Sequence, residues 1–279
     1  MLFGFTLPHR ILWLETPCGT VLTGSKKFGI TEIDTLNDVT NSTEKQTLLT
    51  IPYLKYSDIE LKQIKQFVVT GNTLVIMDDF GYGNSVLQDL NIQARFSNEI
   101  LLDPLFSYKN PIIPNITDFS PDLAAAGIKS LTLNHATAIT GAPAADILAR
   151  SSEYSYLDTN VNNKNDTAEV KGPLAIAAAV PAGNGVVILI SDPSIIINSM
   201  ADMNDNDAFM NYIFAHYGNG APISLDRSHI SKSPLDSSKI RLAKIRQILY
   251  NPFVIIGITA LIFGIVTLYI RKKEAAAIG

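Results

Sequence analysis

Three aspartates directly follow apolar runs that are typical of buried strands. Asp78 and Asp79 follow Leu-Val-Ile-Met, and Asp192 follows Val-Val-Ile-Leu-Ile-Ser. In open α/β sheets ligands bind beyond the carboxyl ends of the strands, so carboxylates at these positions could hold a metal ion or act as general acid and base. Aspartate also caps turns and helices routinely. We therefore treat the three as candidate ligand or metal residues and assign no catalytic residue.

Nucleophilic catalysis finds no support in the sequence. It needs a Ser or Cys in a strained strand-to-helix turn with a base nearby, but no Gly-x-Ser-x-Gly occurs and the turn after Met77 reads Asp-Asp-Phe-Gly-Tyr-Gly. The single cysteine, Cys18, excludes an intrachain disulfide and a Cys-based metal site. The four histidines are scattered without paired spacing. The sequence therefore predicts no enzyme, no cofactor and no assigned metal site.

Two further patterns are incomplete. Residues 202–207, Asp-Met-Asn-Asp-Asn-Asp, resemble the front of a calcium loop but lack the central glycine and the distal glutamate, so we interpret them as the cap of a helix. The glycine-containing turns lack the Walker lysine and the dinucleotide fingerprint. A net charge of -4 gives no general attraction to phosphate, so nucleic acid is excluded as a partner.

The elements that must position the aspartates follow a strand, helix, strand order. Residues 47–52 and 73–77 are typical of strands, the second of the fully buried kind found in parallel sheets. Between them, Ser57 and Glu60 match a capping box, which predicts the start of a helix that ends at Gly71. This order is the βαβ unit of an α/β domain.

Downstream patterns extend the same organisation. Asn84 is expected to cap a second short helix, and residues 91–121, with several Pro and Asn, are interpreted as a long surface excursion. The remaining expected elements are a strand at 128–133, a hairpin of strands at 173–180 and 185–191, and a closing helix from about residue 206 to 217. Together they predict one α/β domain over residues 16–218, with a mostly parallel sheet flanked by helices.

An apolar run at 252–270 contains no charged residue. As a helix it would be about 28 Å long, close to the thickness of the bilayer core. It predicts a C-terminal transmembrane helix, a single-pass protein of the cell membrane, and lipid as a partner. Residues 219–251 are expected to be a linker with a basic amphipathic lead-in, 271–279 a short basic tail, and 1–15 the end of a missing span.

Three Asn-X-Ser/Thr sequons, at Asn41, Asn115 and Asn165, are candidate glycosylation sites. They favour a domain on the extracytoplasmic side. Basic residues flank both ends of the expected span, so charge alone leaves the orientation open. The apolar stretch at the start of the chain is too short for a signal peptide or a span.

Two blocks carry a resemblance to a known family. Residues 67–92 and 184–217 resemble the core and closing blocks of a prokaryotic and archaeal membrane-anchored family known as a domain of unknown function, and residues 24–33 are similar to its opening stretch. The resemblance covers about residues 16–217. It implies a class I glutamine-amidotransferase-like or flavodoxin-like fold without the catalytic cysteine. It also implies a relation to the extracytoplasmic component of gliding-motility-type ABC transporters.

These observations lead to an expected function and two alternatives. The expected function is a non-enzymatic binding or scaffold domain, held outside the membrane, that acts with other membrane or ATPase proteins. One alternative is a hydrolase or metal-dependent enzyme that uses the strand-end carboxylates. The other is an accessory subunit of an ABC-type transporter. The sequence identifies neither the ligand nor the physiological process.

Overall fold

The computed structural model describes residues 28–196, 198–230, 263–264, 266–268 and 270. Nearly all of these belong to one compact unit, Cys18–Ser231, and the other unit contains residues 1–17 and 232–279. The segments expected at 1–15 and 271–279 therefore lie outside the described residues, as does Cys18.

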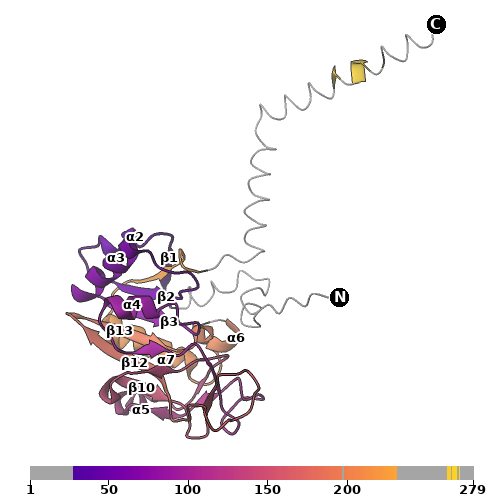
Figure 1. Ribbon diagram of the computed structural model, residues 1–279. Helices are drawn as coiled ribbons and strands as arrows, with labels where there is room; N and C mark the ends of the chain where they lie inside the picture. Colours follow the sequence, from indigo (N-terminus) through magenta and orange to yellow (C-terminus); the bar gives the residue numbers. More distant parts are fainter. Residues whose placement is uncertain (1–27, 197, 231–262, 265, 269, 271–279) are drawn as a thin grey trace. The chain divides into compact units, whose positions relative to one another are not determined.

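A 10-stranded sheet runs through the unit Cys18–Ser231 (Figure 1). Its strands lie in the order β1 (Ile30–Ile33), β14 (Ile223–Asp226), β2 (Thr47–Thr50), β3 (Thr73–Met77), β13 (Gly185–Ile190), β12 (Ala175–Ala182), β10 (Ile147–Arg150) and β7 (Asp118–Phe119). In addition, β9 (Ile139–Thr140) pairs with β12, and β4 (Arg95–Phe96) pairs with β9. All pairings from β1 to β13 are parallel, and all those beyond β13 are antiparallel.

The expectation of a mostly parallel flavodoxin-like or class I glutamine-amidotransferase-like sheet is therefore wrong, because the sheet is mixed. The physical cause is the hairpin of β12 and β13, which reverses the chain at a turn where Gly183 has a φ of +60°. Beyond β12 lie β10 and β7, which precede it in the chain and pair antiparallel as well.

The parallel part forms as its sequence predicts. Helix α3 (Asp58–Val69) begins with a complete capping box: the Ser57 side chain accepts from the Glu60 backbone, and the Glu60 side chain accepts from the Ser57 backbone. The helix stops just before Gly71, which has a φ of +109°. The strands expected on either side are confirmed as β2 and β3, and every residue of β3 is buried.

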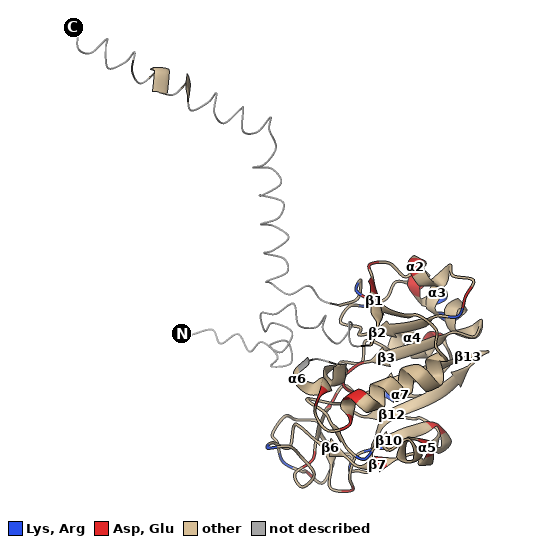
Figure 2. Cartoon of the chain, turned by 180° about the vertical axis from the view of Figure 1, so that it is seen from behind, with Lys and Arg blue, Asp and Glu red and all other residues tan. Residues whose placement is uncertain are grey.

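Helices cover both faces of the parallel strands. Alternate strand residues such as Leu74 and Ile76 pack in one core with α3 and with α4 (Asn84–Asp89). Their neighbours Val75 and Met77 pack in a second core with α7 (Asn206–Gly218). Since successive strand side chains point to opposite faces, α3 and α4 lie on one face and α7 on the other. The rear view in Figure 2 shows α7 lying across the sheet.

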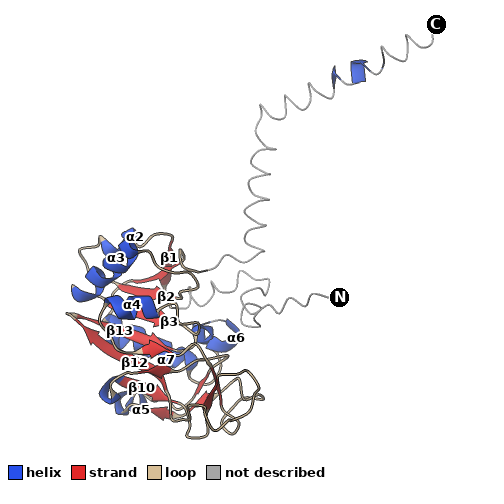
Figure 3. Ribbon diagram, viewed as in Figure 1, coloured by secondary structure: helices blue, strands red, loops and turns tan. Residues whose placement is uncertain are grey.

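Residues 91–121 contribute to the core, which corrects the interpretation of a surface excursion. Two small sheets involve this region: β5 (Ile100–Leu102) pairs with β11 (Tyr156–Asp158), and β6 (Asn115–Ile116) pairs with β8 (Leu131–Thr132). Five of their apolar side chains are almost fully buried: Leu101, Leu102, Ile116, Leu131 and Leu157. Figure 3 distinguishes the strands, in red, from the loops, in tan. The strand expected at 128–133 is reduced to β8. The remaining short helices are α2 (Asn37–Thr40), α5 (Pro121–Ala125) and the 3-10 helix η2 (Ala144–Asp146).

The closing part of the domain extends beyond the expected boundary at residue 218. After β13 the chain forms η3 (Pro193–Ile196), α6 (Asn198–Ala201) and α7, and then returns to the sheet as β14. This strand lies between β1 and β2, so residues 223–226 belong to the sheet and not to a linker. The helix expected near 206–217 is confirmed as α7.

The expected membrane anchor is also corrected. Across the described residues, no helix has both the length and the apolar character needed to cross a bilayer. Most of the run at 252–270 lies outside the described residues. The expected transmembrane helix, the single-pass localisation and the lipid partner that depended on it are therefore not supported.

Candidate functional site

The chain leaves β3 and β13 toward opposite faces of the sheet. Helix α4 follows β3 and packs in the core of α3, whereas α7 follows β13 and packs in the other core. Two neighbouring parallel strands with diverging connections form a topological switch point, the place where open α/β sheets bind ligands. Met77 is paired with Ile190 at the ends of these strands. The structure therefore brings Asp78, Asp79 and Asp192 to one edge.

Asp78 holds the loop that follows β3. Its Oδ1 atom accepts hydrogen bonds from the backbone nitrogens of Phe80 (2.7 Å) and Gly81 (2.9 Å), and its Oδ2 atom accepts one from Gly83 (2.6 Å). Gly83 occupies the cap position of α4, which the sequence had suggested for Asn84. Asn84 instead bonds both backbone groups of Phe96. Asp78 therefore caps the turn that follows its strand, which is the structural role that aspartate often has at such a position.

Asp192 connects the segment after β8 with the segment after β13. Its Oδ2 atom accepts a hydrogen bond from the backbone of Asn134 at 2.6 Å, and its Oδ1 atom accepts one from Ser194 at 2.7 Å. The side chain is fully buried, and this burial raises the pKa of Asp192 to about 6 against the opposing effect of these bonds. Beside it, Ser191 Oγ is buried and has no hydrogen-bond partner among the described residues.

Tyr53 lies within the field of the third aspartate, Asp79, and Phe80 follows it in the chain. The rings of Tyr53 and Phe80 meet edge to face with centroids 5.3 Å apart, and the ring of Phe80 lies 6.4 Å from that of Tyr82. Burial raises the pKa of Tyr53 well above its usual value, and the charges of Asp79, Asp192 and Asp78 raise it further. Tyr82 is exposed. The edge thus combines a negative electrostatic field with one exposed aromatic side chain, that of Tyr82.

A second polar cluster at the same edge was missed by sequence reasoning. His229 Nδ1 lies 2.6 Å from Asp226 Oδ2, and His229 Nε2 lies 3.5 Å from Glu60 Oε1. The ring of Tyr56 stacks on the imidazole with centroids 3.9 Å apart. The cluster joins the end of β14 to the first turn of α3. The four-residue strand that ends at Asp226, Ile-Ser-Leu-Asp, is too short to be recognised from the sequence.

The charges of this cluster favour a protonated histidine. Burial alone would lower the pKa of His229, but the carboxylates of Asp226 and Glu60 raise it above its usual value. Burial alone would raise the pKa of Asp226, but hydrogen bonds from His229 and Ser228 lower it below its usual value. Ser228 donates to Asp226 through both its backbone nitrogen and its hydroxyl. The cluster is therefore a buried ion pair with satisfied oxygens, a stabilising arrangement.

The other sites foreseen from sequence lie apart from this edge. Of the sequon residues, Asn41 and Asn165 are exposed, whereas Asn115 accepts a hydrogen bond from Thr132 Oγ1 and is half-buried. In residues 202–207, Asp205 Oδ2 accepts from the backbone of Lys129 and Ser130. Asp205 occupies the cap position of α7 without a side-chain capping bond. This segment ties α7 to the β8 region.

Within the described part of the chain, no three His, Cys, Asp or Glu side chains are grouped so that they could hold a metal ion. The strand-end carboxylates therefore form a polar edge and not a cluster of metal ligands. What the arrangement can do is present negative charge and aromatic surface at a switch point.

Residues 22–213 match the family described as a domain of unknown function, DUF4350. The chain belongs to the DUF4350 family. The match includes Asp78, Asp79 and Asp192 but ends before the residues of β14, so the Asp226–His229 cluster lies outside it. The expectation that the chain is a member of a domain-of-unknown-function family is confirmed at this level.

Solved structures show what the DUF4350 domain is similar to in fold. The N-terminal domain of mmIFT52 is 11% identical, with a TM-score of 0.51 over 67% of this chain and 82% of that chain. A beta-galactosidase from Bacillus circulans sp. alkalophilus is 13% identical, with a TM-score of 0.39 over 63% of this chain and 23% of that chain. No curated protein matches the DUF4350 chain. At such identities the likeness to mmIFT52 shows the fold alone.

Proposed function

We propose that this domain is a non-enzymatic binding module that takes up a basic side chain of a partner protein at the switch point between β3 and β13. The observation that supports this most is the aromatic run of Tyr53, Phe80 and Tyr82 beside Asp79. The face of an aromatic ring attracts an ammonium or guanidinium group, and a neighbouring carboxylate strengthens the attraction.

The roles of the neighbouring aspartates favour binding over proton transfer. Asp78 and Asp192 both accept backbone hydrogen bonds that hold the loops of the edge in place. A carboxylate used in this way positions other groups. Their negative charges still act on a ligand near Tyr53, as they already act on the pKa of its hydroxyl. These roles support a site that attracts a cation and does not transfer a proton to it.

A narrower proposal concerns the partner. The sequence resemblance implies a protein of an ABC-type transport system or of another ATPase-containing assembly, for which this domain would be a scaffold or accessory subunit. A pull-down with the full chain as bait tests this separately from the site. Recovery of an ATPase or permease by the wild type but not by Tyr82→Ala supports both proposals, and recovery by neither sinks the narrower one.

The site itself is tested with a hexa-arginine peptide titrated into the full chain by calorimetry. Loss of one cation–π contact in Tyr82→Ala should weaken binding by about fivefold, and Asp79→Asn should weaken it too. Tyr108→Ala is the matched control, since Tyr108 is an exposed tyrosine of similar accessibility in another loop. No binding at millimolar peptide, or equal binding by all variants, would refute the proposal.

A hydrolase is a second candidate, favoured by one observation. The raised pKa of Asp192, about 6, is in the range that suits a general acid near neutral pH. The full chain would be assayed on nitrophenyl esters, glycosides and phosphates, alongside Asp192→Asn. Turnover by the wild type that disappears in the variant favours the hydrolase, and no turnover on any substrate removes this candidate.

A further inference from the structure

The loop between β11 and β12 has the residue pattern of a calcium-binding loop. In a 12-residue EF-hand-type loop, oxygen ligands come from positions 1, 3, 5, 7, 9 and 12, and position 6 makes a sharp turn. Residues 158–169 place oxygen-bearing side chains at every position that ligates through its side chain: Asp158, Asn160, Asn162, Asp166 and Glu169. Position 7 is Lys164, which ligates through its backbone carbonyl in such loops. The pattern is complete where that of residues 202–207 is truncated.

The structure closes this loop at its base. Leu157 donates its backbone N–H to Val170 at 3.0 Å, and Tyr156 pairs with Lys171 in an antiparallel bridge. The first and last positions are therefore brought together by paired backbone. Asn163, at position 6, has a φ of +58°, the left-handed conformation that glycine usually supplies there and that asparagine tolerates.

The buried carboxylates of the loop give an independent reason to expect a cation. Asp158 is only 3% exposed and Glu169 only 6%, yet among the described residues neither has a Lys, Arg or His partner. Asp158 accepts one backbone hydrogen bond on each oxygen, from Asn162 and Asn163, which leaves half of its acceptor capacity unused. Buried carboxylates without a counter-charge are costly, and a bound cation would compensate them.

The side chains of the remaining positions converge on one another. The amide nitrogens of Asn160 and Asn162 both donate to Asp166 Oδ2, at 2.7 and 2.8 Å. Their amide oxygens, which accept the backbone N–H groups of Asn162 and Lys164, are hard ligands of the kind that Ca²⁺ prefers, and they have a second lone pair with which to bind an ion. In the structure the three carboxylates, Asp158, Asp166 and Glu169, accept hydrogen bonds from the loop itself and are not gathered around one point, so Ca²⁺ binding requires the loop to draw them together.

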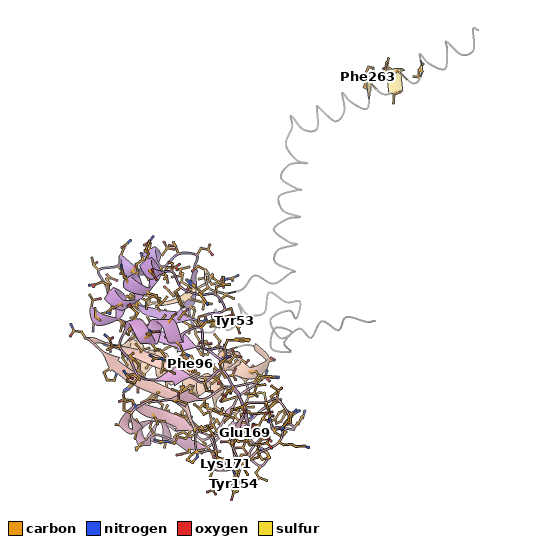
Figure 4. The ribbon with its side chains drawn as sticks, viewed as in Figure 1. Tyr53, Phe96, Tyr154, Glu169, Lys171 and Phe263 are labelled. Carbon is orange, nitrogen blue, oxygen red and sulfur yellow. The ribbon has the colours of Figure 1, made fainter. Side chains whose placement is uncertain are left out.

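We propose that residues 158–169 bind one Ca²⁺ ion through Asp158, Asn160, Asn162, the Lys164 carbonyl, Asp166 and Glu169. This site is separate from the switch point: Figure 4 shows Glu169, Lys171 and Tyr154 near one end of the domain and Tyr53 away from them. The proposal goes beyond the binding function proposed for the strand-end aspartates, and either can fail without the other.

Calcium chloride titrated into the full chain by calorimetry tests the site. We expect one ion per chain, a dissociation constant of about 1 mM or tighter, and weaker binding of Mg²⁺, which tolerates this irregular oxygen shell poorly. Glu169→Gln should weaken Ca²⁺ binding at least about tenfold. Glu153→Gln is the matched control, because Glu153 is an exposed glutamate in the neighbouring loop, and it should bind as the wild type does. No heat at millimolar Ca²⁺, or equal affinity of Glu169→Gln and wild type, overturns the proposal.

Two further variants keep the test decisive if Glu169→Gln does not fold. Asn162→Ala removes an exposed ligand side chain and should weaken Ca²⁺ binding. Asn163→Gly supplies the usual residue at position 6 and should bind at least as tightly as the wild type. Terbium luminescence gives a second readout, because Tyr156 lies in the field of Asp158, Glu169 and Asp166. Tyr156→Phe should reduce sensitised emission while Ca²⁺ affinity is retained, and unchanged emission would place the ion elsewhere.

Discussion

His229 Nδ1 lies 2.6 Å from Asp226 Oδ2, and this pair closes the end of the last strand against the first turn of α3. The imidazole is sandwiched between two carboxylates on its ring nitrogens and stacks on Tyr56 on its face. Tyr53 also donates its backbone N–H to the carbonyl of His229 at 2.9 Å. One residue thus couples β14, the loop after β2, and helix α3.

Replacement of His229 by alanine should destabilise the domain in a pH-dependent way. Removing one member of a buried ion pair costs about 3 kcal/mol. The pKa of His229 is raised by Asp226 and Glu60 against the effect of burial, so its contribution is complete below pH 6.5 and declines as pH rises through the folded value. Asp226 has a lowered pKa, so its contribution declines in acid. Urea unfolding from pH 5 to 9 should show the largest difference near pH 5–6.

The control for this variant is His216→Ala, because His216 is exposed on α7 and stacks only on neighbouring rings. It should change the free energy of unfolding by less than about 0.5 kcal/mol at every pH. A pH-independent loss in His229→Ala would mean that the ring acts only by packing on Tyr56.

Because of Asp192, the wild type should lose stability as the pH rises from 4 to 6. Burial raises its pKa from 3.8 to about 6, so in this interval the folded state holds a proton that the unfolded state has lost. The free energy of unfolding then falls as pH rises, by about 3 kcal/mol over the interval. Asp192→Asn cannot titrate and should lack this slope. Parallel pH profiles of the two proteins in chemical denaturation would contradict the assigned pKa shift.

Asp78→Ala should destabilise the domain by about 2–3 kcal/mol, because three backbone N–H groups lose their acceptor at once. Asp78→Asn keeps one acceptor oxygen and should fall between alanine and the wild type. The measurement is guanidinium unfolding, with the exposed Asp34→Ala as control. If Asp78→Ala instead raised stability, the residue would be a functional charge held at a cost and not a loop anchor.

Gly185→Ala should destabilise the β12–β13 hairpin by about 3 kcal/mol. A Cβ at this position would collide with the backbone carbonyl oxygens of Val68 and Asn72, which cannot move without disturbing the end of α3. Asn184→Ala is the control in the same turn, since its side chain is exposed and its backbone N–H still reaches Val69. Thermal unfolding of both variants distinguishes backbone crowding from a general sensitivity of the turn.

The local signals in the sequence were sufficient for the parallel half of the sheet. The capping box of Ser57 and Glu60, the continuous apolar run of β3 and the turn at Gly71 each report on nearby residues, and each was confirmed. The predicted hairpin is confirmed as β12 and β13, but the antiparallel pairings beyond β12 could not be predicted from local signals. Strands of two or three residues, such as β4 and β7, have no periodicity of their own and exist only because β9 and β10 offer them backbone partners.

The candidate site shows the same division between local and long-range information. That Asp78, Asp79 and Asp192 would meet followed from their places at the ends of strands. The role of His229 did not, because its partner Glu60 is far away in the sequence and its neighbour Asp226 ends a strand too short to recognise. In the loop 158–169 the spacing of the oxygen-bearing residues is local information, and it can be read directly from the sequence.

The position of β14 between β1 and β2 has a consequence for synthesis on the ribosome. Among the described strands, β1 pairs with β14 alone, and β14 is what joins it to β2. A nascent chain that ends before residue 226 therefore offers no place for β1 to dock and leaves one edge of β2 open. Docking of the last strand then pairs the first one, so that the two ends of the domain become ordered in a single late event.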